Sequence, residues 1–330
     1  MSTKKKNLLL MSAQKVDLEF ATKVAEQCDL HLISVVDPVE GIHLLDQDGA
    51  SLVFADCTNE SQYQALEQAI QDRMGLFSDK INPNLFHFLV PNERNLAKLR
   101  YTFESPILGN LVFRDESTLT ELIDRYSKVC AALLGKKTFE LSAFVGDSAE
   151  TQSVQIEAPK QKPDVLQGVK DFMLRVGYHP RLASLATSAA DELLFNAFYE
   201  APVDEFGKTV GKTMFRGGTS VRSLFKPVTL QLAFDGKSTG IGVIDEYGSL
   251  NKSKLLAGIM SLFPDDRRKG RAVPIGQAIG LSLQLRQGAS LGFLCDPGNR
   301  TLSMAFFPLQ KKFVDFRKSF RFVVTQFYLK

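Results

Sequence analysis

Residues 7 to about 135 alternate five times between a short apolar run and a stretch with helical spacing of its apolar residues. Such alternation predicts a parallel sheet covered by helices on both faces, and strands buried on both faces read as nearly continuous apolar runs. The expected strands are Asn7–Ser12, Leu30–Val36, Ser51–Ala55, Leu85–Val90 and Gly109–Phe113. The expected helices are Leu18–Cys28, Pro38–Gln47, Ser61–Met74, Glu93–Phe103 and Ser117–Leu134.

The carboxyl ends of these strands are where a parallel sheet usually carries its site. Asp56 follows the third expected strand, Ser12 and Ala13 end the first, Pro91 follows the fourth and Arg114 follows the fifth. In order and size this region resembles the receiver domain of two-component response regulators, a five-stranded parallel flavodoxin-like fold. The resemblance implies that Asp56 stands at the phosphoacceptor position.

Three positions depart from the receiver pattern. The family has an acidic magnesium-binding pair, a Ser or Thr, and a Lys where this chain has Ser12-Ala13, Pro91 and Arg114. Phosphoryl transfer to a carboxylate needs a cation to neutralise the incoming oxygens. We therefore expect Asp56 to be phosphorylated poorly or not at all and to be a solvated carboxylate at a strand end. The domain would then be a pseudo-receiver used for docking or dimerisation.

The second half of the chain is organised around a helical pattern from about Pro180 to Ala201. Glu192 and Asn196 are four residues apart, so on a helix they share one face. A carboxylate and a carboxamide in this arrangement can hold a divalent cation and polarise a water molecule. The plainer alternative is the solvated side of an ordinary amphipathic helix.

Two later stretches favour a nucleotide site. An apolar strand from Ile241 ends in Asp245 and is followed by Gly248. A segment with Gly276, Ala278 and Gly280 opens a helix, Ile279–Gln287, and the last core strand runs from Thr301 to Phe307. In order and spacing these stretches resemble the N, G1 and G2 boxes of the ATPase family shared by gyrase, the large heat-shock chaperone, sensor histidine kinases and MutL. The likeness is strongest to the anti-sigma-factor serine kinases and covers residues 154–308.

This resemblance implies an α/β sandwich of the Bergerat ATPase type that binds ATP with Mg²⁺. It makes Glu192 the general base or water orienter, Asn196 the magnesium ligand and Asp245 the acceptor for the adenine amino group. Backbone close to the nucleotide, and a hydroxyl beside it, would come from Gly248, Gly276, Gly280 and Thr301.

Parts of the expected site are open to two interpretations. The family has glycines where this chain has Tyr247 and Ser249, so Tyr247 would either narrow the adenine pocket or stack on the base. Residues 216–219, Arg-Gly-Gly-Thr, are a phosphate cradle or, more simply, an exposed loop. The segment equivalent to the ATP lid carries cations that would neutralise the triphosphate or form a solvated loop: Arg267, Arg268, Lys269 and Arg271.

Composition narrows the class of protein. A net charge of +3 is too small to indicate nucleic-acid binding. The four cysteines are scattered without a CxxC pair, which indicates neither a disulfide framework nor a zinc site. No apolar run has the length of a membrane span, and we expect a cytoplasmic protein. None of the four histidines fits a phosphoacceptor on a helical hairpin, so an autophosphorylating histidine kinase is disfavoured.

The expected organisation is a receiver-like domain (residues 1–138), a histidine-kinase-like ATPase domain (139–312) and an aromatic, basic tail (313–330). Within the junction, Lys137–Val145 has strand character. The tail is expected to be a helix or strand covering an apolar surface and is a candidate dimer contact. The expected function is a two-component-type signalling protein whose ATP-binding, kinase-like domain acts on or binds a protein partner. The alternative is a non-enzymatic scaffold, or pseudokinase, whose ATPase fold binds a protein partner without nucleotide.

Overall fold

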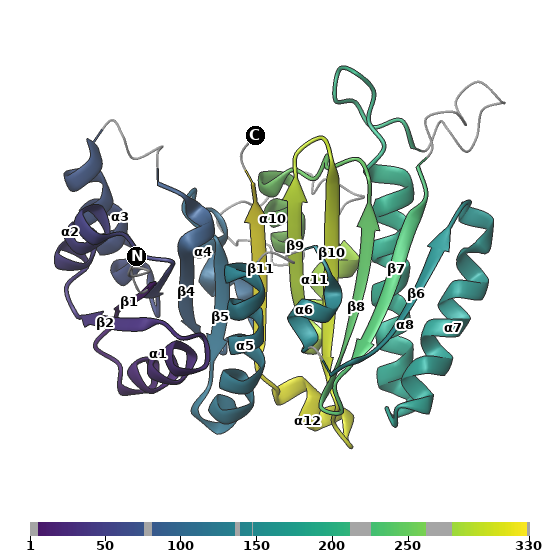
Figure 1. Ribbon diagram of the computed structural model, residues 1–330, viewed down its shortest axis with the longest axis horizontal. Helices are drawn as coiled ribbons and strands as arrows, with labels where there is room; N and C mark the ends of the chain where they lie inside the picture. The colour runs from purple at the N-terminus through teal and green to yellow at the C-terminus, as the bar shows by residue number, and fades with distance from the viewer. Residues whose placement is uncertain are drawn as a thin grey trace, which may run out of the picture. The chain divides into compact units, whose positions relative to one another are not determined.

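The computed structural model describes residues 6–75, 81–135, 139–146, 148–211, 226–261 and 279–328. The chain divides into two compact units, each of mixed α/β structure (Figure 1). Unit 1 contains Met1–Lys136 and Phe320–Thr325, and unit 2 contains Lys137–Ser319 and Gln326–Lys330. The boundary near residue 137 is close to the expected one, but the C-terminal tail is divided between the two units.

Unit 1 contains the five predicted parallel strands, in the order β2-β1-β3-β4-β5. The middle strands are apolar along their length and almost fully buried, as expected for strands covered on both faces. Their bounds are β1 (Asn7–Met11), β2 (His31–Val35), β3 (Leu52–Asp56), β4 (Phe86–Pro91) and β5 (Asn110–Arg114).

Two pairs of helices accompany this sheet. Helix α1 (Lys15–Gln27) packs with α5 (Leu119–Leu134), and α2 (Pro38–Asp48) packs with α3 (Glu60–Met74). The remaining predicted helix, Glu93–Phe103, is wrong in its first half. That segment is a 3₁₀ turn at Leu96–Leu99 followed by the short α4 (Arg100–Phe103). The side chain of Asn95 accepts a hydrogen bond from the backbone N–H of Ala97, and such local bonds compete with regular helix.

A sixth strand, formed by the tail that was expected to be a helix or strand, completes unit 1. Residues Phe320–Thr325, most of them in β11 (Arg321–Phe327), pair antiparallel with β5, placing Arg321 opposite Phe113. The ring of Phe322 is fully buried and meets the Tyr126 ring edge-on at 5.5 Å between centroids. This part of the tail therefore covers an apolar surface, as expected, and the surface belongs to the chain's own N-terminal unit.

The sheet of unit 2 is antiparallel, in the order β9-β10-β8-β7-β6. Residues 228–245 form an antiparallel hairpin of two of these strands. The strand bounds are β6 (Glu150–Ile156), β7 (Val228–Phe234), β8 (Ser238–Asp245), β9 (Ser290–Asp296) and β10 (Arg300–Pro308).

Helix α8 (Pro180–Phe195) is central to unit 2, because it packs on β8 and β10 and also contacts two other helices, α7 (Lys162–Arg175) and α11 (Ile279–Gln287). Two further helices, α10 (Lys252–Met260) and α12 (Phe313–Lys318), belong to the same unit. No helix in the described ranges is long and apolar enough to cross a membrane, and all four cysteines are free.

The expected strand at Lys137–Val145 is wrong in its described part, because Leu141–Val145 forms a helix, α6. This helix lies against the face of β8 that carries Gly240 and Gly242. A Cβ atom on Gly240 would lie 2.8 Å from a methyl group of Val145. The glycines on β8 therefore make room for α6 to cover the second face of the sheet.

The C-terminal strand should be essential to unit 1. We expect Phe322→Ala to lower the free energy of unfolding of that unit by about 3–5 kcal/mol, because a fully buried ring is lost. Urea unfolding followed by circular dichroism measures this effect. Val314→Ala, at a side chain that is 60% exposed, is the control and should change stability by less than about 0.5 kcal/mol. A similarly small effect of Phe322→Ala would contradict the role of this strand.

Candidate functional site

A cavity of about 110 Å³ opens in unit 2 between α8 and the sheet. Its floor consists of two directly opposed cross-strand pairs, Asp245 with Thr301 and Val243 with Ser303. These four side chains share one face because side chains alternate along a strand. Typical ligand pockets measure roughly 300–1,000 Å³, so the cavity formed by the described residues is smaller than these.

The opposite wall comes from the end of α8 and from a π-helical turn, η6 (Asn196–Glu200), that continues it. In this turn the N–H of Ala201 bonds to the carbonyl of Asn196 at 2.8 Å, five residues back. Single π turns inside α-helices are frequent at functional sites. The residues on the cavity side are Leu193, Asn196, Ala197, Glu200 and Ala201.

Asp245 carries the buried charge of the cavity floor. It is 5% exposed, and burial raises the pKa of its carboxyl group to about 6. Its Oδ1 atom accepts hydrogen bonds from the backbone N–H of Tyr247 at 3.0 Å and of Gly248 at 3.3 Å, and Thr301 also bonds to the carboxyl group. These bonds fix the carboxyl group beside the cavity, while its burial leaves the ionised form less stable than in water.

Gly248 and Tyr247 lie in the turn that follows Asp245. Gly248 has a φ of +56°, and a Cβ atom there would lie 2.2 Å from the carbonyl oxygen of Asp296. Glycine is therefore required for the backbone to pass this turn. The Tyr247 hydroxyl accepts a bond from the N–H of Lys226 at 2.9 Å, and Tyr247 is outside the set of described residues that line the cavity. Tyr247 thus leaves this cavity open.

Glu192 lies beside the cavity wall rather than in it. Its carboxyl group bonds to the Asn196 side chain, and burial, with the neighbouring Asp191 charge, raises its pKa. The carboxyl group also packs on Gly280, where an added Cβ would be 2.4 Å from Oε2. Gly280 is therefore needed to seat Glu192.

The structure brings together Asn196, Asp245 and Thr301 in one cavity, with Gly248 and Glu192 close by. It adds residues that the sequence analysis missed: Glu200, Ser249, Asn251 and Lys254. The available signal for Glu200 was its position four residues after Asn196, which is the same spacing as Glu192 before it. Three expected elements, Gly276, the lid cations and the glycine pair at 217–218, lie outside the described residues.

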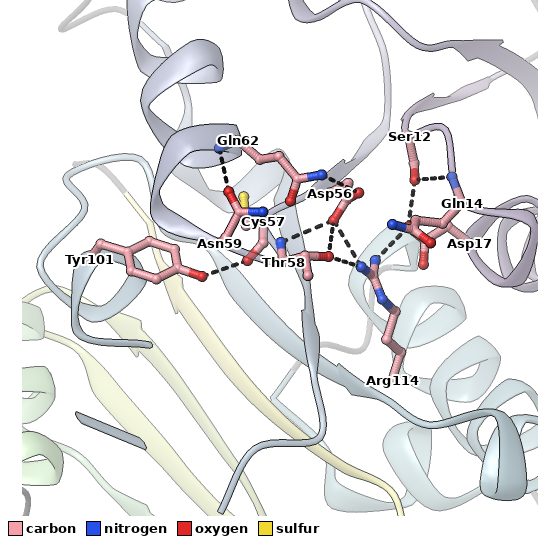
Figure 2. Close-up of polar contacts among 10 residues, drawn as sticks. All are labelled: Ser12, Gln14, Asp17, Asp56, Cys57, Thr58, Asn59, Gln62, Tyr101 and Arg114. Atoms are coloured by element: carbon pink, nitrogen blue, oxygen red, sulfur yellow. Dashed lines mark hydrogen bonds and ion pairs between the residues drawn. The ribbon is translucent and has the colours of Figure 1, made fainter. Parts of the chain in front are cut away.

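In unit 1, Asp56 belongs to a buried ion-pair network with Arg114 and Asp17 (Figure 2). Arg114 on β5 contacts Asp56 through Nη2 at 2.9 Å and Asp17 through Nη1 at 2.5 Å. The side chains of Asp56 and Asp17 are 6% and 1% exposed. The expectation of a solvated carboxylate is therefore wrong, because the guanidinium neutralises Asp56 within the protein.

Other donors complete the coordination of Asp56. The backbone N–H and the hydroxyl of Thr58 donate to Oδ1, at 3.0 and 2.5 Å, and Gln62 donates to Oδ2 at 3.0 Å (Figure 2). Arg114 also contacts the Thr58 hydroxyl. Both oxygens of the carboxylate are thus engaged.

Asp17 was also missed by the sequence analysis. It lies in the first turn of α1, a common place for an acidic residue, which gives no hint of its partner 97 residues away. Burial raises the pKa of its carboxyl group, and the Arg114 charge opposes that rise. The Ser12 hydroxyl donates to Asp17 at 2.6 Å. Ser12, just after β1, thus helps to hold the carboxylate that α1 supplies.

Comparison with known proteins assigns no family to either unit. No protein-family model matches the chain, and no curated protein is similar to it.

Asp245→Asn should stabilise the folded chain at neutral pH. The folded pKa of about 6 exceeds the ordinary value of 3.8, so the contribution of Asp245 to stability is greatest below pH 3.8 and falls as pH rises to about 6. The loss is complete above that pH and amounts to about 3 kcal/mol. The carboxamide keeps an oxygen acceptor for Tyr247. We expect a gain of about 1–3 kcal/mol at pH 7.5 and little at pH 4, measured by urea unfolding. Glu246→Gln, at an exposed neighbour, should show no such pH dependence.

Arg114→Ala should destabilise unit 1 by about 3–5 kcal/mol, because it leaves two buried carboxylates without their cation. Arg73→Ala is the matched control, since its ion pair with Asp46 is exposed and should contribute less than about 1 kcal/mol. Adding Asp17→Asn to Arg114→Ala should recover part of the loss. Equal effects of the two arginine substitutions in urea unfolding would show that the network does not stabilise unit 1.

Proposed function

We propose that this chain is a signalling protein whose unit 2 binds ATP with magnesium and acts on or binds a protein partner, and whose unit 1 is a receiver-like domain that does not accept a phosphoryl group. The observation that carries the proposal is the meeting of Asn196, Asp245 and Thr301 in one cavity. They come from three separate elements, and each stands at the position implied by the resemblance to the Bergerat ATPases.

The floor of the cavity suits an adenine ring. A buried carboxylate at the end of β8 can accept a hydrogen bond from the exocyclic amino group, and this bond would favour the ionised form of Asp245. Guanine presents a carbonyl oxygen at the corresponding position, which the carboxylate would repel. Apolar contacts come from Leu193, Ala197, Val243, Leu255 and Leu281.

The Asn196 side chain fits a magnesium ion carried in with the triphosphate. The structure describes no group of three His, Cys, Asp or Glu side chains in its ranges that could hold a metal. Magnesium bound with phosphates needs only one or two protein oxygens, and the Asn196 carboxamide at the cavity wall supplies one. When bound, the ion neutralises phosphate oxygens.

Catalysis depends on Glu192. A raised pKa and a hydrogen bond to Asn196 suit a residue that orients a hydroxyl or water and takes up its proton. Its place beside the cavity, against Gly280, supports the second candidate, a pseudokinase that binds a protein partner. Tyr247 does not line the cavity and so leaves room for a ligand. This favours nucleotide binding, whether or not a phosphoryl group is then transferred.

Unit 1 is proposed to dock or dimerise rather than to receive a phosphoryl group. Both oxygens of Asp56 are engaged, and the guanidinium of Arg114 contacts the carboxylate that an incoming phosphate would have to reach. A nucleophilic carboxylate needs a free lone pair and access to the phosphorus atom. Three donors surround Oδ1 of Asp56 and its side chain is 6% exposed, so access to the carboxylate is restricted while this network is intact.

Calorimetric titration with ATP and magnesium tests the proposal. The unaltered protein should bind ATP and discriminate against GTP, and Asn196→Ala should weaken magnesium-dependent binding by at least about tenfold. Asp191→Asn, at the neighbouring exposed carboxylate, is the control and should bind normally. Absence of binding at millimolar ATP would exclude the nucleotide site and leave the scaffold.

A further inference from the structure

We infer that Glu200 is a second protein contact for magnesium and that its charge excludes metal-free polyphosphate, so that nucleotide enters this cavity only as its magnesium complex. This inference rests on the proposed ATP site and specifies the form of ligand that the site accepts. Nothing in the N-box resemblance points to Glu200, which follows Asn196 by four residues.

The position of Glu200 supports a direct contact. Glu200 is the last residue of the π-helical turn that Asn196 begins, and both residues line the cavity. Asn196 is thus flanked by a carboxylate on each side along the same helix.

The charges of the described part of the cavity wall disfavour metal-free polyphosphate. Two acidic residues, Glu200 and Asp245, and one basic residue, Lys254, line it, and Lys254 is exposed. A metal-free triphosphate would therefore meet like charge in a partly desolvated site, where repulsion is stronger than in bulk water. A cation between the phosphates and Glu200 converts this repulsion into attraction, and carboxylate oxygens are preferred magnesium ligands.

A purely structural role for Glu200 makes a different prediction. Glu200→Gln keeps the size of the side chain and an oxygen acceptor, so hydrogen bonds within the wall can persist while the charge is lost. If the residue only shapes the turn, the ratio between ATP affinity with and without magnesium should not change. The ratio separates the two roles even where absolute affinity shifts.

The experiment is calorimetric titration of the full chain with ATP in excess magnesium and, separately, in EDTA. We expect the unaltered protein to bind at least about 100-fold more tightly with magnesium. Glu200→Gln should bind about tenfold more weakly with magnesium and more tightly without it, so that the ratio falls markedly. Circular dichroism verifies that the variant is folded.

Glu205→Gln is the matched control, because Glu205 is exposed in the loop whose Val203, Gly207 and Thr209 line the cavity. It should leave the magnesium ratio unchanged. An unchanged ratio in Glu200→Gln, or equal tightening in both buffers, would overturn the inference while leaving the ATP site standing. Absence of ATP binding by the unaltered protein in both buffers would overturn the proposed function and this inference together.

Discussion

The burial of one carboxylate, Asp245, sets the design of unit 2. A charged group at the end of an inner strand is costly unless donors surround it, and the chain supplies them from the next turn and from Thr301 on the neighbouring strand. The turn can supply its N–H groups only because Gly248 adopts a positive φ against the β9–β10 turn. The same register that pairs Asp245 with Thr301 places Val243 and Ser303 beneath α8. The cavity is thus a consequence of how this charge is accommodated.

Unit 1 also buries carboxylates, but it pairs them with an arginine side chain. Asp17 and Asp56 share one internal cation, Arg114, and both oxygens of Asp56 accept hydrogen bonds from the protein. Breaking such a buried pair is costly, although its net contribution relative to an apolar core can be small. Asp245 has no such cation among its described partners and lies beside an open cavity, where an added donor would contribute most.

Local patterns in the sequence predicted much of the fold, and contacts between distant residues account for most of what they missed. Apolar runs gave β1 to β5, and helical spacing gave α8 and α11 with nearly correct bounds. The tail was expected to be a helix or a strand, and local spacing could not decide between them, because its structure depends on the open edge of β5, about 200 residues earlier. The ion pair between Asp17 and Arg114 was missed because its two residues are also distant in the sequence. A shared site for Asn196, Asp245 and Thr301 was expected from the resemblance of their motifs to those of the Bergerat ATPases.

The departures from local rules in unit 2 are concentrated around one cavity. A regular α-helix would have continued through Asn196–Glu200, yet the chain forms a π turn there. A carboxylate is buried at Asp245, and Glu192 has a raised pKa against a glycine that has no room for a side chain. Each of these features costs stability, and natural proteins tolerate such conflicts chiefly at functional sites. Because the π turn holds Asn196 and Glu200 on the same wall, facing the carboxylate on the sheet, the conflicts together form a surface of oxygen ligands and hydrogen-bond acceptors. Such a surface is suited to a cation and an amino group, which are the two features that a magnesium–ATP complex presents.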